Sequence, residues 1–407
     1  MGKIVFVLVA ALVVLGSGGK ARAQIDPEKR QLFQLGYNQP IIGRSSISGY
    51  AFYYRNDPGF LRTNITLRLA VAPIYLDSEL GFSHALGEHT DLAIGLAGGG
   101  FADSYFEIRQ GNYLRGESFT GHAGEVSASV YHLFNPGQLI PLNGIFRVNP
   151  HYSFYQKDSD TRGDFVLPRD RGSVNIRTGF RLGGREPTML PALGMEFSGW
   201  YEGQFRTESG AYGLGGDRRV EAASHLFWGR MLFIYTLPEW KHNFSLSLTA
   251  GTSLNADRFS AYRIGGVLPL ASEFPLTLPG YYYQEISARR FALLSGQYSL
   301  PLDHAKNWNL TALATVAKLE YLSGLEQPKT WNSGAGLGLG YHSPKGSWQI
   351  MAGYSYGFNA VRSHGRGGHS VGLLSQWDLE ARHKTRVPIY DLDNPYKSRG
   401  LFRLFGE

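Results

Sequence analysis

Two short stretches carry residue types that hydrolases and metal sites use. His364 and His369 lie in "SHGRGGHS", and Asp103 precedes Ser104 in "GFADSYFE". Nucleophilic catalysis needs a base and an orienting group within reach of the nucleophile, and neither stretch supplies such a set. The histidine spacing fits no strong metal-ligand pattern, and no Gly-x-Ser-x-Gly element occurs. We therefore predict no catalytic residue, no metal and no cofactor, and an enzyme is the weakest of the hypotheses.

Arginine and glutamate side chains recur on the polar side of segments in which apolar and polar residues alternate. Unpaired arginines spaced in this way attract anions, whereas arginines neutralised by carboxylates brace a protein. Both interpretations stay open from the sequence. The residues concerned are Arg68, Arg147, Arg177 and Arg181, with Glu125, Glu196 and Glu202 as candidate partners.

The stretch "LPGYYYQE" (278–285) places three tyrosines directly after a proline and a glycine that break regular structure. Consecutive aromatic residues usually belong inside a strand, so their position after a turn needs another explanation. Tyrosines offer ring area for packing and hydroxyl groups for hydrogen bonds. The candidate residues of this loop motif are Leu278, Pro279, Gly280, Tyr281, Tyr282 and Tyr283.

The first residues, "MGKIVFVLVAALVVLGSGGKARAQ", predict a secretory signal peptide. Lys3 precedes an apolar run, and Ala21-Arg22-Ala23 has the small-residue cleavage pattern, so removal of residues 1–23 is expected. The formal charge of +7 falls to +4 for residues 24–407, because three basic residues and no acid leave with the signal. The remaining basic residues form no clustered patch, so we expect no nucleic-acid partner.

Composition and alternation together predict the fold class. The chain has 52 glycines, 24 tyrosines, 24 phenylalanines and no cysteine, which in an exported protein is typical of an outer-membrane β-barrel. In "HNFSLSLTAGTS", Phe244, Leu246 and Leu248 face one way, and Ser245 and Ser247 face the other. A closed barrel explains this pattern, because lipid covers the apolar face, the polar face lines a lumen, and no strand edge stays free.

The expected fold is all-β: a transmembrane antiparallel β-barrel of about sixteen strands. An even number returns both ends of the barrel to the periplasm, with long loops outside and short turns inside. Alternation identifies fifteen strands, and the sixteenth is expected at Gln39–Arg44. The fifteen lie near residues 46–54, 62–72, 78–86, 90–101, 118–133, 143–156, 171–183, 192–206, 219–236, 241–254, 285–300, 308–321, 332–342, 348–358 and 368–380.

Four segments are expected along the chain. Asp26 and Pro27 are typical of a helix start, so one short helix is expected before the barrel. The basic tail is either an arm that contacts a partner or a solvated end, and both stay open. The segments are the signal peptide 1–23, a short periplasmic segment 24–38, the barrel 39–380 and a periplasmic tail 381–407. Long loops are expected near 102–117, 157–170, 207–218, 255–284, 322–331 and 359–367.

Four motifs follow one another in the last third of the chain: "YRIGG" (262–266), "LPGY" (278–281), "FALLSGQYSLPL" (291–302) and "GAGLGLGYHSPKGSWQIMAGYSYG" (334–357). Their order and spacing resemble the C-terminal barrel of the BamA-type surface-antigen superfamily. Five expected strands follow the loop motif. The resemblance implies the same arrangement, because the family's conserved loop lies between the eleventh and twelfth of sixteen strands.

Two features depart from the family pattern. In the family, an arginine of the loop motif reaches into the lumen and pairs with an aspartate of the wall. Here Pro279 stands at the arginine position, and Thr315 is the residue nearest the aspartate position. Both partners are absent together, which is consistent with the high cost of an unpaired buried charge. Residues 24–45 are also too few for a periplasmic POTRA domain, so a barrel-only member is expected.

The resemblance implies a role in assembling or translocating protein, or lipid, at the outer membrane, with a separate periplasmic partner. It also implies a weak seam between the first and last strands. The candidate seam residues, in "HSVGLLSQWDL", are Gly372, Leu373, Trp377 and Leu379.

The alternative function is a porin-like channel for small anionic solutes, in which the arginines and glutamates above face the lumen. Outer-membrane lipid surrounds the barrel in either case. The loop 255–284 is expected to fold into the lumen, where Tyr281–Tyr283 would pack against the inner wall. A tyrosine-rich tip exposed outside the barrel is the other possibility.

Overall fold

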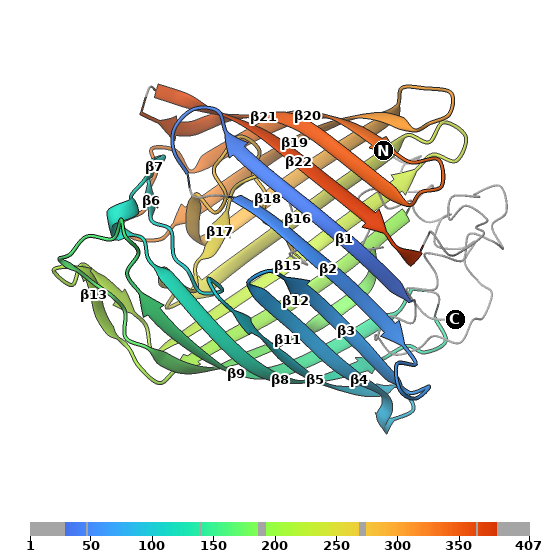
Figure 1. Ribbon diagram of the computed structural model, residues 1–407, viewed down its shortest axis with the longest axis horizontal. Helices are drawn as coiled ribbons and strands as arrows, with labels where there is room; N and C mark the ends of the chain where they lie inside the picture. The colour runs from blue at the N-terminus through green and yellow to red at the C-terminus, as the bar shows by residue number, and fades with distance from the viewer. Residues whose placement is uncertain are drawn as a thin grey trace, which may run out of the picture.

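The computed structural model describes residues 29–45, 48–138, 140–185, 193–267, 274–363 and 365–380. Sixteen long antiparallel strands pair in chain order and close into one barrel, because the first strand pairs with both the second and the last (Figure 1). A further short strand pairs only with its neighbour on the wall. Within the described residues, no helix is long and apolar enough to cross a membrane.

The wall strands have the following bounds: β1 Arg30–Pro40, β2 Ser48–Pro58, β3 Ile65–Ala72, β4 Tyr75–Gly87, β5 Thr90–Gly99, β8 Thr120–Leu133, β9 Leu142–Gln156, β11 Arg171–Arg185, β12 Leu193–Arg206, β15 Ala223–Thr236, β16 Asn243–Leu254, β18 Ile286–Pro301, β19 Trp308–Tyr321, β20 Trp331–His342, β21 Trp348–Arg362 and β22 Gly365–Asp378. Short elements lie in the long connections: β6 Ile108–Arg109, β7 Asn112–Tyr113, the 3₁₀ turn η1 Arg115–Glu117, β10 Phe165–Val166, β13 Gly210–Leu214, β14 Arg218–Val220 and β17 Tyr262–Ile264.

The fifteen strands expected from alternation each correspond to one wall strand, and the sixteenth expectation is wrong in position. The first strand is Arg30–Pro40, not Gln39–Arg44, and residues 30–38 are extended where a short helix was expected. Pairing explains the difference, because this segment fills the gap between β2 and β22. Without it, both neighbours would have an unpaired edge facing lipid.

The connection expected as a long loop at 359–367 is also different. β21 continues to Arg362 and β22 begins at Gly365, so most of the segment expected as a loop belongs to these two strands. The predicted signal peptide, residues 1–23, and the predicted tail, residues 381–407, lie outside the described residues.

The two faces of the wall differ as the alternation predicted. On β16, Phe244, Leu246 and Leu248 are exposed on the outer surface. Ser245 and Ser247, between them, line a cavity of about 900 Å³ inside the barrel. An apolar outer surface is suited to lipid contact, and a polar inner surface to a hydrated lumen.

Aromatic side chains mark the end of the barrel that carries the short turns. Trp308 is exposed there, and its ring lies 4.9 Å from that of Tyr341, which lies 5.1 Å from that of Trp348. Such aromatic girdles occur where a barrel crosses the boundary between hydrocarbon and headgroups.

The opposite end carries the long connections, and several of them pack into one body that we call the outer cap (Figure 1). The outer cap comprises residues 100–119, 157–170, 207–222 and 255–267. Its centre is a cluster of aromatic side chains, with the ring of Phe119 5.9 Å from Phe165, 6.5 Å from Tyr212 and 6.2 Å from Phe259. One ring therefore contacts three other loops.

Candidate functional site: the barrel interior and its loop

The predicted lumen arginines do lie on the inner face, and each has an acidic partner. Arg68 of β3 and Arg147 of β9 both pair with Glu79 of β4. The hydroxyl of Tyr131 joins the group, since it donates to Glu79 Oε2 at 3.0 Å and accepts from the Arg147 guanidinium at 3.1 Å. Arg147 Nε also donates to Ser129 at 2.7 Å.

The second pair of arginines lies further round the wall. Arg177 Nε is 3.4 Å from Glu202, and Arg181 Nε is 4.0 Å from Glu196, as the sequence suggested. Arg230, which the sequence analysis did not single out, donates to Glu196 at 3.1 Å. The arginines of this interior are therefore each paired with a carboxylate of another wall strand.

Glu125, the third acid considered as an arginine partner, has other contacts. It accepts hydrogen bonds from Asn149 at 2.7 Å and from His151 Nδ1 at 3.0 Å. The other ring nitrogen of His151 is 2.9 Å from Asp103, so this histidine joins the wall to a residue of the outer cap.

Of the residue types considered for catalysis, Asp103 is held by His151 and Ser153, while the Ser104 hydroxyl contacts the backbone of Gly121. His369 lies beside Tyr354, and His364 lies outside the described residues. Among the residues that the structure describes, no group of three or more histidines and carboxylates is placed to hold a metal.

The cavity-lining residues of the other half of the wall are uncharged, and many of them are polar. Hydroxyl pairs join neighbouring strands there, with Ser295 3.0 Å from Thr315 and Ser355 2.7 Å from Ser370. The cavity therefore has a charged side on β3 to β15 and a hydroxyl-bearing side on β16 to β22. Three residues of the 255–284 loop, Val267, Pro275 and Thr277, line the same cavity.

The loop contacts both sides of this cavity. The ring of Phe274 lies 4.4 Å from that of Trp228 and 5.6 Å from that of Trp200. The guanidinium of Arg230 lies 4.3 Å from the centre of the Phe274 ring, within the range of a cation–π contact. On the other side, Leu278 is fully buried in a cluster with residues of β18 and β19.

The loop motif itself is buried against the inner face of β20 and β21. Leu278, Pro279, Gly280, Tyr281 and Tyr282 are buried, and Tyr283 is half-buried. Gly280 has φ +80° and its N–H donates to Ser355 at 3.1 Å. A Cβ at this position would overlap the backbone of Gly357, so only glycine permits the close approach.

The tyrosines differ in their partners. The Tyr281 hydroxyl donates to Asn332 of β20 at 3.0 Å, and its ring lies against Gly357. The Tyr282 hydroxyl contacts the carbonyl of Ile42 in the β1–β2 connection at 3.3 Å. The Tyr283 hydroxyl accepts a hydrogen bond from its neighbour Gln284 at 2.9 Å. Tyr281 therefore holds the motif to the wall, and Tyr282 holds it to the β1–β2 connection.

A buried ion pair fixes this loop. Arg362, at the end of β21, contacts Glu285 through two nitrogens, at 2.9 and 3.0 Å, and both side chains are almost fully buried. The same guanidinium donates to the carbonyl of Gly280 at 3.1 Å and lies 3.8 Å from the ring centre of Tyr282. We call this group, with Ser355, the loop clamp.

Sequence reasoning found the ion pair of the family to be absent and missed the pair that is present. Pro279 and Thr315 hold no charge, and the charges lie instead at Glu285 and Arg362. Glu285 stands in the quoted motif, but Arg362 fell in a segment expected to be a long outer loop. Local alternation could not have found it, because the register of β21 against β22 shifts between Gly357 and Val361, and an uninterrupted alternation would place Arg362 on the outward face.

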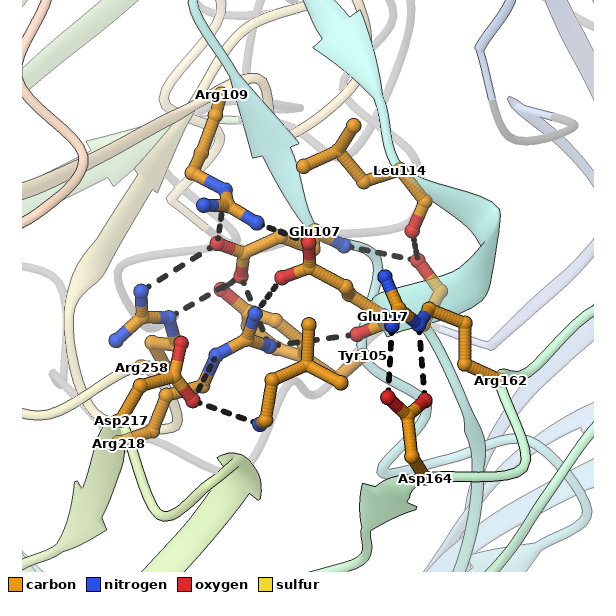
Figure 2. A network of polar contacts seen from close by, with 12 residues as sticks. Tyr105, Glu107, Arg109, Leu114, Glu117, Arg162, Asp164, Asp217, Arg218 and Arg258 are labelled. Carbon is orange, nitrogen blue, oxygen red and sulfur yellow. Dashed lines mark hydrogen bonds and ion pairs between the residues drawn. The ribbon is translucent and has the colours of Figure 1, made fainter.

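A second buried charge cluster lies in the outer cap (Figure 2). Glu107 accepts from Tyr105 at 2.8 Å and from Arg258 at 3.1 Å, and it lies 3.6 Å from Arg218. Burial alone would raise the pKa of Glu107, but the nearby Arg258 and Arg218 outweigh it and hold this pKa below its usual range. Glu107 thereby joins three of the loops in the outer cap.

The four predicted seam residues lie where β22 meets β1. Gly372 stands opposite Asn38, and Leu373 opposite Tyr37. The Trp377 ring is 5.7 Å from that of Phe33, on the opposing strand. The N–H of Leu379 donates to the carbonyl of Gln31 at 2.8 Å. The register is continuous from Leu32 to Pro40, so this junction is closed in the structure.

The closed wall of sixteen antiparallel strands has the fold of BamA-type barrels. Comparison with solved structures supports this. CdiB from Acinetobacter baumannii matches with a TM-score of 0.55 and 10% identity, covering 86% of this chain and 60% of that one. BamA from Haemophilus ducreyi lacking POTRA domains 1–3 matches with a TM-score of 0.53 and 11% identity, covering 86% and 70%.

CdiB from Escherichia coli is similar to the same degree, with a TM-score of 0.53 and 11% identity over 86% of this chain and 63% of its own. The chain thus spans less than two thirds of either CdiB chain, and at these identities the likeness concerns the fold. No family model matches the sequence, and neither does any curated protein.

Proposed function

We propose that this barrel acts in protein or lipid assembly or translocation at the outer membrane, together with a separate periplasmic partner. The observation that carries the proposal is the position of the loop clamp relative to the seam. Gly280 donates to Ser355 of β21, Ser355 contacts Ser370 of β22, and Ser370 stands opposite Pro40 of β1. A movement of the loop would therefore act directly on the strand that closes the barrel.

The state of the interior also favours this proposal over an open pore. The outer cap joins the long loops at one end, and the 255–284 loop contacts both sides of the cavity. A resting barrel of this kind is closed, and transport needs a change in the loop or the seam. Lipid contacts the apolar outer surface, and we place the partner at the end with the short turns.

The alternative is a porin-like channel for small anionic solutes. The observation that favours it is the set of arginines around a cavity of about 900 Å³. Their acidic partners weaken this alternative, because the pairs neutralise much of the positive charge that would select anions.

Conductance in planar bilayers separates the two functions. The purified barrel is expected to show low conductance with brief openings, because the loop and the outer cap obstruct the lumen. Large, steady, anion-selective openings of the unmodified protein would instead establish the channel and overturn the proposal.

A cysteine lock tests the seam in cells, and the chain has no native cysteine to interfere. Tyr37 and Leu373 stand opposite each other on the outer face, so Tyr37→Cys with Leu373→Cys would join β1 to β22. The matched control is Met231→Cys with Leu248→Cys, an exposed opposite pair on β15 and β16.

Oxidation of the seam lock is expected to change the protein or lipid content of the outer membrane, and a reductant should reverse the change. The control lock should have no effect. Equal outer-membrane content in the oxidised seam variant and the control would contradict a function that needs the seam to open. Copurification from solubilised membranes tests the partner separately.

A further inference from the structure

Basic side chains gather on the outer surface of the barrel where β18 and β19 approach the long loops. Arg289 and Arg290 are 54% and 59% exposed, and Lys318 is also exposed. We call these three residues the basic rim. Both arginines contact Glu320, so the four side chains together carry two positive charges in excess.

The register places Arg290 and Lys318 on the lipid-facing side, and Arg289 joins them through its contact with Glu320. Phe291 and Leu293 of β18 are buried toward the interior, whereas Leu294 is exposed on the other face. Residues two apart share a face of a strand, so Arg290 lies on the same outer face as Leu294. On β19, Val316 is exposed opposite Leu294, and Lys318 follows it on the same face.

The distance along β19 sets the depth of the rim in a membrane. Ten residues separate Lys318 from Trp308, which belongs to the girdle at the other end. At about 3.3 Å per residue this is about 33 Å along the strand. A strand tilt of about 40° reduces it to about 25 Å across the membrane, the height of the apolar band.

The rim therefore lies at the level of the headgroups. Trp331, exposed on β20, marks the same level, and the Lys318 ammonium lies 5.5 Å from the centre of its ring. A tryptophan beside a basic residue is typical of the membrane interface. Excess positive charge at this depth attracts anionic headgroups.

We propose that the basic rim binds the phosphate groups of a lipid in the outer leaflet, of the lipopolysaccharide class. The leaflet follows from the orientation of the barrel, since long loops face outside. Cations on two neighbouring strands, offset by two residues, suit a headgroup with more than one phosphate. This site is independent of the assembly or translocation proposal, because it lies on the outer surface and involves neither the seam nor the loop clamp.

The test variant is Arg290→Gln with Lys318→Gln, which leaves the Arg289–Glu320 pair in place. The matched control is Arg62→Gln with Lys345→Gln, which removes two exposed charges from the short turns at the other end. Native mass spectrometry in detergent measures binding of bisphosphorylated lipid A, with monophosphorylated lipid A, phosphatidylglycerol and inorganic phosphate as the comparison probes. Heat-modified migration on gels confirms that each variant is folded.

Lipid A binding is expected to weaken on the order of tenfold in the rim variant and to stay unchanged in the control. Monophosphorylated lipid A should bind less tightly to the unmodified protein, and added salt should weaken binding further. Equal lipid A binding by both variants would overturn the proposal. Equally strong, rim-dependent binding of phosphatidylglycerol or of free phosphate would overturn the assignment to this lipid class.

Discussion

At the scale of residues, one buried ion pair explains why the loop motif can lack its expected arginine. Glu285 and Arg362 bring opposite charges together between loop and wall, 77 positions apart in the chain. Such a pair is costly to break by removal of one partner, because the other charge is left buried and unpaired. Arg362 also reaches the Gly280 carbonyl and the Tyr282 ring, so the charge pair and the motif form one unit.

Replacing Arg362 alone should therefore be worse than replacing both charges. Arg362→Met is expected to destabilise the clamped loop by about 3–5 kcal/mol, because Glu285 keeps its charge in a buried site. Arg362→Met with Glu285→Gln should recover a large part of this loss. Urea unfolding from lipid vesicles, with limited proteolysis of the loop, measures the four members of the cycle. A double variant that loses the sum of the single losses would refute the coupling.

Gly280 offers a second prediction at this scale, with a matched control. Gly280→Ala should release the loop, because it combines a left-handed backbone with overlap against the Gly357 backbone. Gly59→Ala has a similar φ of +76° but no neighbouring atom within 4 Å of its Cβ, so only the backbone cost of about 1–2 kcal/mol applies. Protease cleavage within 274–285 should rise strongly in the first variant only. Equal cleavage of the two variants would mean that the close approach of Gly280 to the Gly357 backbone does not hold the loop in place.

At the scale of elements, the sequence predicts those strands in which apolar and polar residues alternate, because this pattern is local. Alternation located fifteen strands, because one face of each must meet lipid and the other the interior. It missed β1, since "DPEKRQLF" has the local chemistry of a helix start and only pairing with β2 and β22 makes it a strand. It likewise missed Arg362 as a site residue, because nothing local to β21 indicates that Glu285 lies beside it.

The outer cap gives a pH-dependent prediction. The pKa of Glu107 is lowered, so its charge stabilises the cap above the usual glutamate value of 4.5, and this stabilisation is lost as pH falls through the lowered pKa. The protection of the backbone amides at β6 and β7, measured as their exchange rate relative to the intrinsic rate at the same pH, should therefore fall at acid pH before that of the wall strands. In Glu107→Gln, the same amides should exchange fast at neutral pH.

The exposed pair Arg162–Asp164 of the same cap provides the control for this experiment. Asp164→Asn should leave both the exchange at neutral pH and its acid dependence nearly unchanged, because exposed ion pairs contribute little. An acid response that persists fully in Glu107→Gln would show that another group opens the cap.

At the scale of the whole molecule, two groups of loops follow one another along the barrel axis, and we propose that both obstruct the interior. The outer cap joins the loops at one end, and the clamped loop contacts both sides of the cavity below it. Two obstructions in series behave like two resistances in series, in which the larger one limits the current. Loss of either obstruction alone therefore leaves the pore largely blocked, while loss of both opens it.

Conductance of three variants tests this arrangement. Glu107→Gln loosens the cap, Gly280→Ala loosens the loop, and each is expected to raise conductance only slightly in planar bilayers. The double variant should conduct far more than the sum of the two increases. If Gly280→Ala alone produced the full conductance, the loop would be the sole obstruction and the cap would be open to solutes. If the double variant stayed closed while its loops were cleaved by protease, the remaining wall would itself block the lumen.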